Sequence, residues 1–283
     1  MPIVLDHVSF TYQPDTPFAA PALHDVSINI RSGQFVGLIG HTGSGKSTLI
    51  QHCNGLLFPL AGQVTVDGMP VLPKGKDLKE IRRKVGLVFQ YPEQQLFEEN
   101  VALDVAFGPK TLGLEDAEIQ RRVRWAMKMV DLEFAKFKDA SPFELSGGEK
   151  RRVAIAGVLA MQPKYLILDE PCAGLDPGGR EEILDQLKRL NEKGLAIVLV
   201  SHSMDDVARL AKRLIVIHEG AVVYDDQVRQ VFSKAKELAD MGLDVPAVMK
   251  LMMLLKEKGL DVRQSVLSAE EGQEEILRVL NHA

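Results

Sequence analysis

The sequence has few of the features that mark secreted proteins, proteins stabilised by structural metal ions, or membrane-spanning proteins. Its 283 residues include only two cysteines, Cys53 and Cys172, which provide neither a disulfide framework nor the paired spacing of a zinc site. No apolar run approaches the roughly 18 residues that a membrane helix needs. The first residues lack the basic and long apolar regions of a signal peptide. These absences predict a cytosolic protein.

The sequence also lacks an excess of basic residues. It has 34 lysines and arginines against 39 aspartates and glutamates, for a formal net charge of −5, and its basic residues are dispersed. Proteins that bind mainly to phosphate backbones usually carry a basic excess or a basic stripe. We therefore expect no nucleic-acid partner.

The pattern of apolar residues predicts an α/β chain. Residues 1–35 alternate apolar and polar positions, which is typical of half-buried antiparallel strands. Four later segments are fully apolar, as buried parallel strands are, and helical patterns separate most of them. These segments are residues 35–39, 85–89, 165–168 and 196–200. The expected core is a mostly parallel sheet covered by helices on both faces.

Two segments depart from this alternation. Strand signals vanish from about residue 93 to 145, which predicts a helical subdomain inserted in the α/β core. The chain becomes helical again near its end, so we expect a domain over residues 1–224 and a small helical extension over residues 225–283. Residues 245–256 are apolar on more than one face. Packing within the chain and contact with a second subunit are equal alternatives for that segment.

The stretch that begins at Gly40 reads Gly-His-Thr-Gly-Ser-Gly-Lys-Ser-Thr and fits the phosphate-binding pattern G-x-x-x-x-G-K-[ST]. It lies between a predicted strand and a predicted helix, where backbone N–H groups and the helix dipole converge on an anion. Lys46 then reaches the β- and γ-phosphates, and the hydroxyl of Ser47 holds Mg²⁺. The complete motif disfavours an ordinary glycine-rich loop. The predicted nucleotide-binding residues here are Gly40, His41, Thr42, Gly43, Ser44, Gly45, Lys46, Ser47 and Thr48.

Polar residues follow three of the predicted parallel strands. Asp169 and Glu170 end one strand, while His202 and Gln90 follow two others. Ligands of parallel sheets bind beyond the carboxyl ends of the strands. Asp169 is expected to hold Mg²⁺, Glu170 to polarise the attacking water, His202 to contact the γ-phosphate, and Gln90 to reach Mg²⁺ or water. With Lys46, these form the predicted catalytic set. Taken singly, each could be an ordinary loop residue.

A second glycine-rich turn opens another helix at Leu145-Ser-Gly-Gly-Glu. Ser146 is a favourable helix-start residue, and Gly147 and Gly148 let backbone N–H groups approach a ligand closely. One nucleotide in the first loop does not need this second turn. We therefore expect it to cap the nucleotide of another copy or of a paralogue, in a head-to-tail dimer.

Taken in order, these motifs resemble the nucleotide-binding subunits of ABC (ATP-binding cassette) transporters over about the first 225 residues. The resemblance implies the P-loop NTPase fold of ABC ATPases, with ATP and Mg²⁺ as cofactors. It also implies roles for two residues outside the patterns above, adenine stacking for Tyr12 and a place in the D-loop for Asp176. The corresponding motifs are Walker A at 40–47, the Q-loop at Gln90, the signature at 145–149, Walker B at 167–170 and the switch histidine at His202.

A narrower resemblance points to the energy-coupling factor (ECF) importers. The stretch Gln-Tyr-Pro-Glu-Gln-Gln-Leu-Phe at 90–97, the stretch at 105–109 and the helix at 151–161 look like that group. The resemblance, closest to the second of two paralogous ATPases, implies ATP hydrolysis coupled to uptake of vitamins or related micronutrients. Implied partners are a paralogous ATPase subunit or a second copy, a transmembrane coupling protein and a small substrate-binding membrane protein. The implied location is the cytoplasmic face of the cell membrane.

The main alternative is a soluble ABC-type ATPase that acts on nucleic acid or ribosomes. Chromosome and repair ATPases of this type insert a long coiled coil, and no sustained heptads occur here. Translation-type members usually carry two cassettes, whereas this chain has one set of motifs. A non-catalytic interaction module is disfavoured because Lys46, Asp169, Glu170 and His202 are present together.

Overall fold

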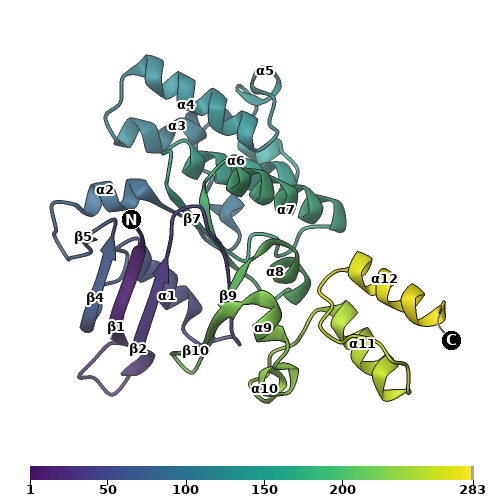
Figure 1. Ribbon diagram of the computed structural model, residues 1–283. Helices are drawn as coiled ribbons and strands as arrows, with labels where there is room; N and C mark the ends of the chain where they lie inside the picture. The colour runs from purple at the N-terminus through teal and green to yellow at the C-terminus, as the bar shows by residue number, and fades with distance from the viewer. Residues whose placement is uncertain (282–283) are drawn as a thin grey trace.

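Two β-sheets form the framework of the computed structural model, which describes residues 1–281 (Figure 1). The first sheet is antiparallel and has the order β2-β1-β4-β5. The second has the order β10-β9-β3-β8-β7-β6, and its strands are parallel except at the β9–β10 edge. The first sheet consists of β1 (Ile3–Tyr12), β2 (Ala20–Ile30), β4 (Ala61–Val66) and β5 (Met69–Pro70). The second consists of β3 (Phe35–Ile39), β6 (Val85–Val88), β7 (Tyr165–Asp169), β8 (Ala196–Val200), β9 (Arg213–His218) and β10 (Ala221–Gln227).

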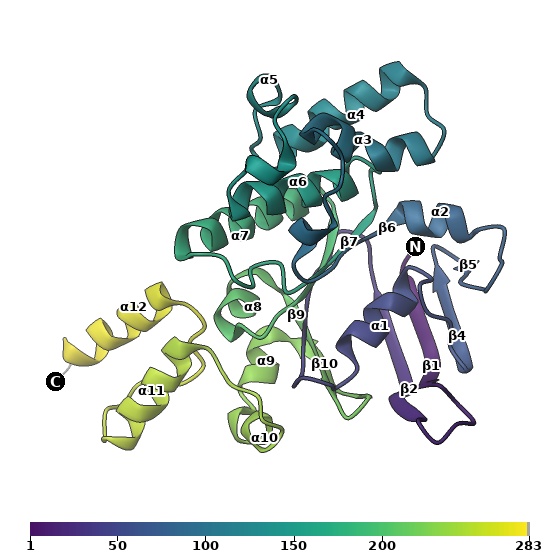
Figure 2. The same ribbon diagram turned by 180° about the vertical axis from the view of Figure 1, so that it is seen from behind.

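Helices cover the second sheet on both faces, and a helical layer extends to one side of it (Figures 1 and 2). Because α3 and α4 pack against α6, this layer continues beyond residue 145, where the sequence predicts that it ends. The helices near the sheets are α1 (Lys46–Cys53), α2 (Leu78–Lys84), α7 (Pro177–Glu192) and α8 (Met204–Leu210). The helical layer holds η1 (Pro92–Gln95), α3 (Val101–Thr111), α4 (Asp116–Met129), α5 (Phe134–Phe137), η2 (Pro142–Glu144) and α6 (Gly147–Leu159).

The last part of the chain divides between two hydrophobic clusters. Side chains of α9 (Val228–Phe232) and α10 (Ala235–Asp240) join the main core. By contrast, α11 (Ala247–Glu257) and α12 (Ala269–Leu280) enclose a small cluster of their own. The sheet ends at Gln227, three residues past the boundary that the sequence predicts. The division into 1–224 and 225–283 stays a prediction, and its last two residues lie outside the described part of the chain.

Both alternatives for residues 245–256 remain open. Met249 and Met252 are buried, whereas Leu251 and Leu254 on the same helix are 44% and 54% exposed. Packing within the chain therefore accounts for one face of α11 only.

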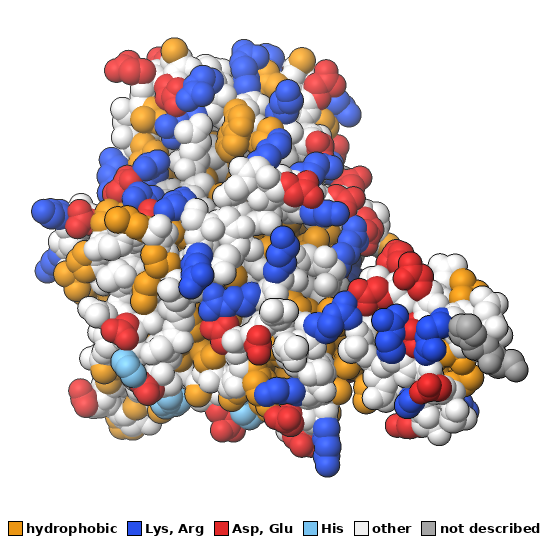
Figure 3. All heavy atoms as spheres, viewed as in Figure 1, with side chains coloured by type: hydrophobic (Ala, Val, Ile, Leu, Met, Phe, Trp, Pro, Cys, Tyr) orange, Lys and Arg blue, Asp and Glu red, His pale blue; other side chains and the backbone are white. Residues whose placement is uncertain are grey.

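The surface shows no segregation of charge on the face in Figure 3, where acidic and basic side chains are interspersed. Within residues 1–281, no helix combines the length and the apolar character needed to cross a membrane.

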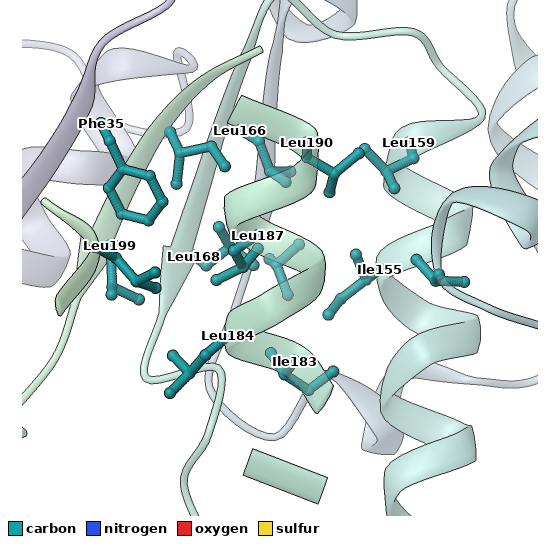
Figure 4. Close-up of a cluster of buried hydrophobic side chains, with 14 of the residues drawn as sticks. Phe35, Ile155, Leu159, Leu166, Leu168, Ile183, Leu184, Leu187, Leu190 and Leu199 are labelled. Carbon is teal, nitrogen blue, oxygen red and sulfur yellow. The ribbon is translucent and has the colours of Figure 1, made fainter. Parts of the chain in front are cut away.

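The main core is built around α7, which lies between the second sheet and α6. Figure 4 shows Ile183 and Leu190 of α7 pointing toward α6, while Leu184 points toward the sheet. All three side chains are at most 4% exposed. Since protein interiors are close-packed, this arrangement fixes α6 relative to the strand ends that carry the predicted catalytic residues.

Asp67 fastens the antiparallel sheet to the edge of the parallel one. It lies in the turn between β4 and β5, and its carboxylate accepts hydrogen bonds from Lys84 (3.1 Å), Lys164 (2.8 Å) and the Tyr165 hydroxyl (2.9 Å). Burial acts to raise the pKa of Asp67, but the hydrogen bonds from Lys164, Lys84 and Tyr165 together hold it below its usual value. The carboxylate is thus stabilised in its ionised form.

Replacing Asp67 with asparagine should destabilise the fold in a pH-dependent way. Because the lowered pKa favours the folded state only while the carboxyl is ionised, this contribution is present above the unfolded pKa of about 3.9 and fades below it. We expect the variant's free energy of unfolding to be about 1–3 kcal/mol lower than that of the wild type at pH 7. The difference between the two proteins should be smaller at pH 3.5. Urea unfolding at the two pH values measures both quantities.

The control is Asp139→Asn, since the Asp139 side chain is 80% exposed. It should change stability by less than about 0.5 kcal/mol. An equal loss at both pH values in Asp67→Asn would contradict the role given to its charge.

Candidate functional site

The glycine-rich loop at 40–45 is shaped by close backbone approaches. A Cβ added to Gly40 would lie 2.3 Å from the carbonyl oxygen of Ile217 in β9. Gly45, which precedes α1, has φ 105°, a conformation that other residues rarely adopt. The loop therefore lies directly against β9, and it ends at the N-terminus of α1 as the sequence predicts.

Lys46, the first residue of α1, folds its side chain back across this loop. Its Nζ atom donates hydrogen bonds to the carbonyl oxygens of Gly40 (2.8 Å) and His41 (2.9 Å). Burial lowers the pKa of Lys46, while the charges of Glu170 and Asp169 act to raise it. The ammonium group thus lies between the loop and the two acids. A phosphate bound by the loop would accept hydrogen bonds from it there.

The two residues predicted to hold Mg²⁺ touch each other. Ser47 donates a 3.0 Å hydrogen bond from its hydroxyl to Oδ2 of Asp169, at the end of β7. Burial raises the pKa of Asp169, while the Ser47 hydrogen bond and the Lys46 charge oppose that rise. This contact joins the phosphate loop to the acidic strand end.

Glu170 has a strained backbone and a poorly solvated carboxylate. Its φ is 49°, in the left-handed region, and its side chain is only 15% exposed. Burial, followed by the neighbouring charge of Asp169, raises its pKa to about 7. The Oε1 atom is buried and lies 3.5 Å from Nε2 of His202. In the described chain it accepts no hydrogen bond. Strained, poorly solvated carboxylates are typical of catalytic positions.

Sheet order explains why three of the predicted catalytic residues follow strand ends at the same edge. Because β7 pairs in parallel with both β6 and β8, the three strands end at one edge of the sheet. Gln90, Glu170 and His202 follow those ends. Burial, followed by the Lys46 charge, lowers the pKa of His202, which favours a neutral ring. Gln90 is exposed, and within residues 1–281 its side chain forms no hydrogen bond, so its role at Mg²⁺ stays a prediction.

Tyr12, predicted to stack on adenine, stands beside the phosphate-loop helix. Its hydroxyl lies 3.1 Å from Oγ1 of Thr48 in α1, and its ring packs edge-to-face against Phe10. The ring remains 39% exposed. A half-exposed aromatic face next to the loop suits a stacking role.

The second glycine-rich turn is separate from the phosphate loop of its own chain. Ser146 caps α6 by accepting a hydrogen bond from the Glu149 N–H, and the Glu149 carboxylate accepts one from the Ser146 N–H. A Cβ added to Gly147 or Gly148 would meet nothing within 4 Å. Asp176 likewise caps its own helix, α7, at the Gly179 N–H. Among the described residues, no hydrogen bond links the turn or Asp176 to the phosphate loop.

Two structural arginines were not predicted from the sequence. Arg180 of α7 bonds to Ser203 (2.6 Å) and Asp206, and so ties the loop of His202 to α7. Arg151 of α6 is 1% exposed and bonds to segments on two sides. The only signal for Arg151 was a basic pair beginning an otherwise apolar helix.

A groove of about 870 Å³ lies next to this site, bounded by β6, η1, α2, α3 and α6. Its walls include the exposed rings of Phe97 and Phe107, which pack edge-to-face 5.0 Å apart. Lys79 and Arg82 of α2 lie at its border. The groove is open and mostly apolar, so it suits a helix better than a small polar ligand.

Comparison with known proteins identifies the family. Residues 23–173 match the family described as ABC transporter. The chain belongs to the ABC transporter family. It is 55% identical over 282 residues to an energy-coupling factor transporter ATP-binding protein, EcfA2, of Clostridioides difficile, covering 99% of this chain and 98% of the relative. It is 51% identical to the protein of that name from Clostridium tetani, covering 100% of this chain and 98% of the relative.

Solved structures of this family agree with the fold. The structure of cbiO1 from Clostridium perfringens, part of the ABC transporter complex cbiONQ, aligns with a TM-score of 0.75 and 36% identity, over 89% of this chain and 98% of that one. A dimeric ATP-binding cassette, MJ0796, bound to ADP and Pi, aligns with a TM-score of 0.70 and 32% identity, over 80% of this chain and 98% of that one.

Several predictions made from the sequence are thereby confirmed. The chain has the ABC ATPase fold, resembles the ECF group along its full length, and is an ATP-binding and ATP-hydrolysing subunit of an ECF-type ABC importer. None of these similar proteins favours the alternative of an ATPase on nucleic acid or ribosomes.

Replacing Glu170 with glutamine should leave ATP binding nearly intact and lower the rate of hydrolysis about 100-fold or more, since the amide cannot accept a proton from the attacking water. Steady-state phosphate release and equilibrium ATP binding measure the two effects. The control is Glu181→Gln, on the exposed side of α7. Turnover near the wild-type rate in Glu170→Gln would remove this residue from catalysis.

Replacing Lys46 with alanine should weaken ATP binding about 10- to 100-fold, because hydrogen bonds between a charged donor and a phosphate contribute about 1.5–3 kcal/mol. Titration with a fluorescent ATP analogue measures the change. Thermal unfolding without nucleotide separates this effect from misfolding. Wild-type affinity in a folded Lys46→Ala protein would contradict the assignment of the loop.

Proposed function

We propose that this chain hydrolyses ATP with Mg²⁺ as one of two ATPase subunits, and so energises uptake of a vitamin or related micronutrient through membrane partners. The contact between Ser47 and Asp169 is the observation that carries the proposal. It joins the phosphate loop to Asp169, and the neighbouring Glu170 has its Oε1 atom 3.5 Å from Nε2 of His202, which supports a common site.

The residues present fit a magnesium ion. Mg²⁺ is usually held by one or two protein oxygens together with phosphates and waters. The Ser47 hydroxyl and the Asp169 carboxylate offer such a pair, and Gln90 follows the adjacent strand. No cluster of three or more acidic, histidine or cysteine ligands occurs among residues 1–281. Bound there, Mg²⁺ supplies charge neutralisation at the phosphates.

The protein residues then divide the work of hydrolysis. Lys46 and the loop N–H groups stabilise negative charge on the β- and γ-phosphates. Glu170 accepts a hydrogen bond from the attacking water through its buried Oε1, which has no other partner in the described chain. His202, 3.5 Å from that oxygen, contacts the γ-phosphate. Tyr12 supplies the stacking surface for adenine.

A second ATPase subunit is needed to complete each site. Ser146, Gly147 and Gly148 form an exposed anion-binding helix start away from their own phosphate loop, and Asp176 lies at the start of α7. In the proposed dimer they face the nucleotide of the other subunit. The dimeric MJ0796 cassette, a relative of similar fold, supports this arrangement. A paralogous ATPase is the preferred partner, with a second copy as the alternative.

The apolar groove is the proposed contact with the membrane-embedded partner. A transmembrane coupling protein would seat a cytoplasmic helix between η1 and the rings of Phe97 and Phe107, while a separate small membrane protein captures the substrate. We attribute the proposed position at the cytoplasmic face of the membrane to that contact.

The experiment is to purify the tagged full-length chain from native membranes in mild detergent and identify its partners by mass spectrometry. We expect a second ATPase and integral membrane proteins. Phe107→Asp should remove the membrane proteins and keep the ATPase, because a charge in an apolar interface opposes docking. Val223→Asp, an exposed change on β10, is the matched control. Recovery without any membrane protein, or with ribosomes, would contradict the proposal.

A further inference from the structure

Arg151 is the largest side chain in the fully buried core, and it is charged. It lies in the first half of α6, the helix that begins with the signature turn. A buried charge destabilises a protein unless hydrogen bonds compensate for it. Arg151 makes four such bonds, and they go to two different segments.

One side of the guanidinium binds the segment that follows Gln90. Nε and Nη2 of Arg151 donate to the two carboxylate oxygens of Glu93 in η1, at 2.9 and 2.7 Å. This two-point geometry fixes orientation as well as distance. Pro92, Gln95 and Leu96 around Glu93 line the groove proposed to receive the membrane partner.

The other side of the guanidinium binds the catalytic turn. Nη1 donates to the carbonyl oxygens of Pro171 and Ala173, both at 2.8 Å. Pro171 directly follows Glu170, and the Ala173 N–H in turn donates to the carbonyl oxygen of Glu170. Arg151 therefore fixes the turn that follows Glu170, and this turn holds the strained backbone of Glu170 in place.

Tyr91 makes a second contact between the same segments. Its ring lies 5.9 Å from the Arg151 guanidinium, and a Cβ on Gly174 would come within 3.5 Å of it. Tyr91 has φ 53°, so the residues next to both ends of the network, Tyr91 and Glu170, are in the left-handed region. Strain of this kind persists only where surrounding contacts over-determine it.

We propose that Arg151 is a positioning residue, which sets the Glu170 turn according to the position of η1 and so lets an occupied groove control the rate of ATP hydrolysis. The inference rests on the proposed function. Glu93 moves with the groove wall, the guanidinium follows its carboxylate, and the carbonyls of Pro171 and Ala173 follow the guanidinium. Stability alone is a weak reason for such a pair, because apolar residues can often replace a buried ion pair without loss.

The test uses the ATPase pair alone and the complete complex with its membrane partner, each carrying wild-type chain or Glu93→Gln. In the complete complex, Glu93→Gln should lower kcat about tenfold, because the Glu170 turn no longer follows the groove wall, with KM for ATP changed less than about twofold. In the ATPase pair alone, the rate should stay within about twofold of wild type.

A double variant, Glu93→Gln with Arg151→Met, guards against simple misfolding because it removes both charges together. It should melt near the wild-type temperature yet show the same loss of stimulation by the membrane partner. Glu118→Gln, which removes the ion pairs of Glu118 with Arg121 and Arg122 on α4, is the matched control and should keep full stimulation.

The outcomes separate the two proposals. If wild-type complex hydrolyses ATP no faster than the ATPase pair, both the proposed coupling and this inference fail. If wild type is stimulated and Glu93→Gln is stimulated equally, only the role of Arg151 fails. An equal loss in the pair and in the complex would likewise make Arg151 a structural residue and overturn the inference.

Discussion

The hydrogen bond between Ser47 and Asp169 joins residues 122 positions apart and defines the site. It exists because β3 and β7 flank β8 in a parallel sheet, so the loops after all three strands lie at one edge. The glycine loop, the acid pair and His202 are each ordinary in isolation. The order of the strands makes them one site, and α7 packed between the sheet and α6 keeps that edge rigid.

Burial shifts the pKa values of the charged groups in the site. Burial lowers the pKa of Lys46 and raises those of Asp169 and Glu170, so all three groups are poorly solvated. A phosphate group with its counterion would offset this poor solvation, because the Lys46 ammonium and the Ser47 hydroxyl already lie beside the acid pair. This preorganisation means that little rearrangement is needed when charge develops on the phosphates.

Most of the features that the sequence predicts come from short local motifs. The phosphate loop, the strand-end acids and the alternation of strands and helices depend on local patterns, and the structure shows the same elements at nearly the same residues. Local patterns give less information about contacts between residues that lie far apart in the sequence. Nothing near Arg180 signals its bond to Ser203, and the basic pair at Arg151 gives no sign that Arg151 is buried. The packing of α6 with α3 and α4 is another long-range contact that the motif at the start of α6 does not indicate.

The cap at Ser146 has a consequence for how firmly two subunits would bind each other in the proposed dimer. The Ser146 hydroxyl donates a 2.7 Å hydrogen bond to the Glu149 carboxylate, the same proton that a phosphate oxygen of a facing nucleotide would take. In a closed dimer, forming one bond breaks the other, and the nearby carboxylate repels the phosphates. Because one bond replaces another, we expect the Ser146 hydroxyl to add little to the strength of such an interface. A cassette that closed too tightly would complete one cycle and then stop.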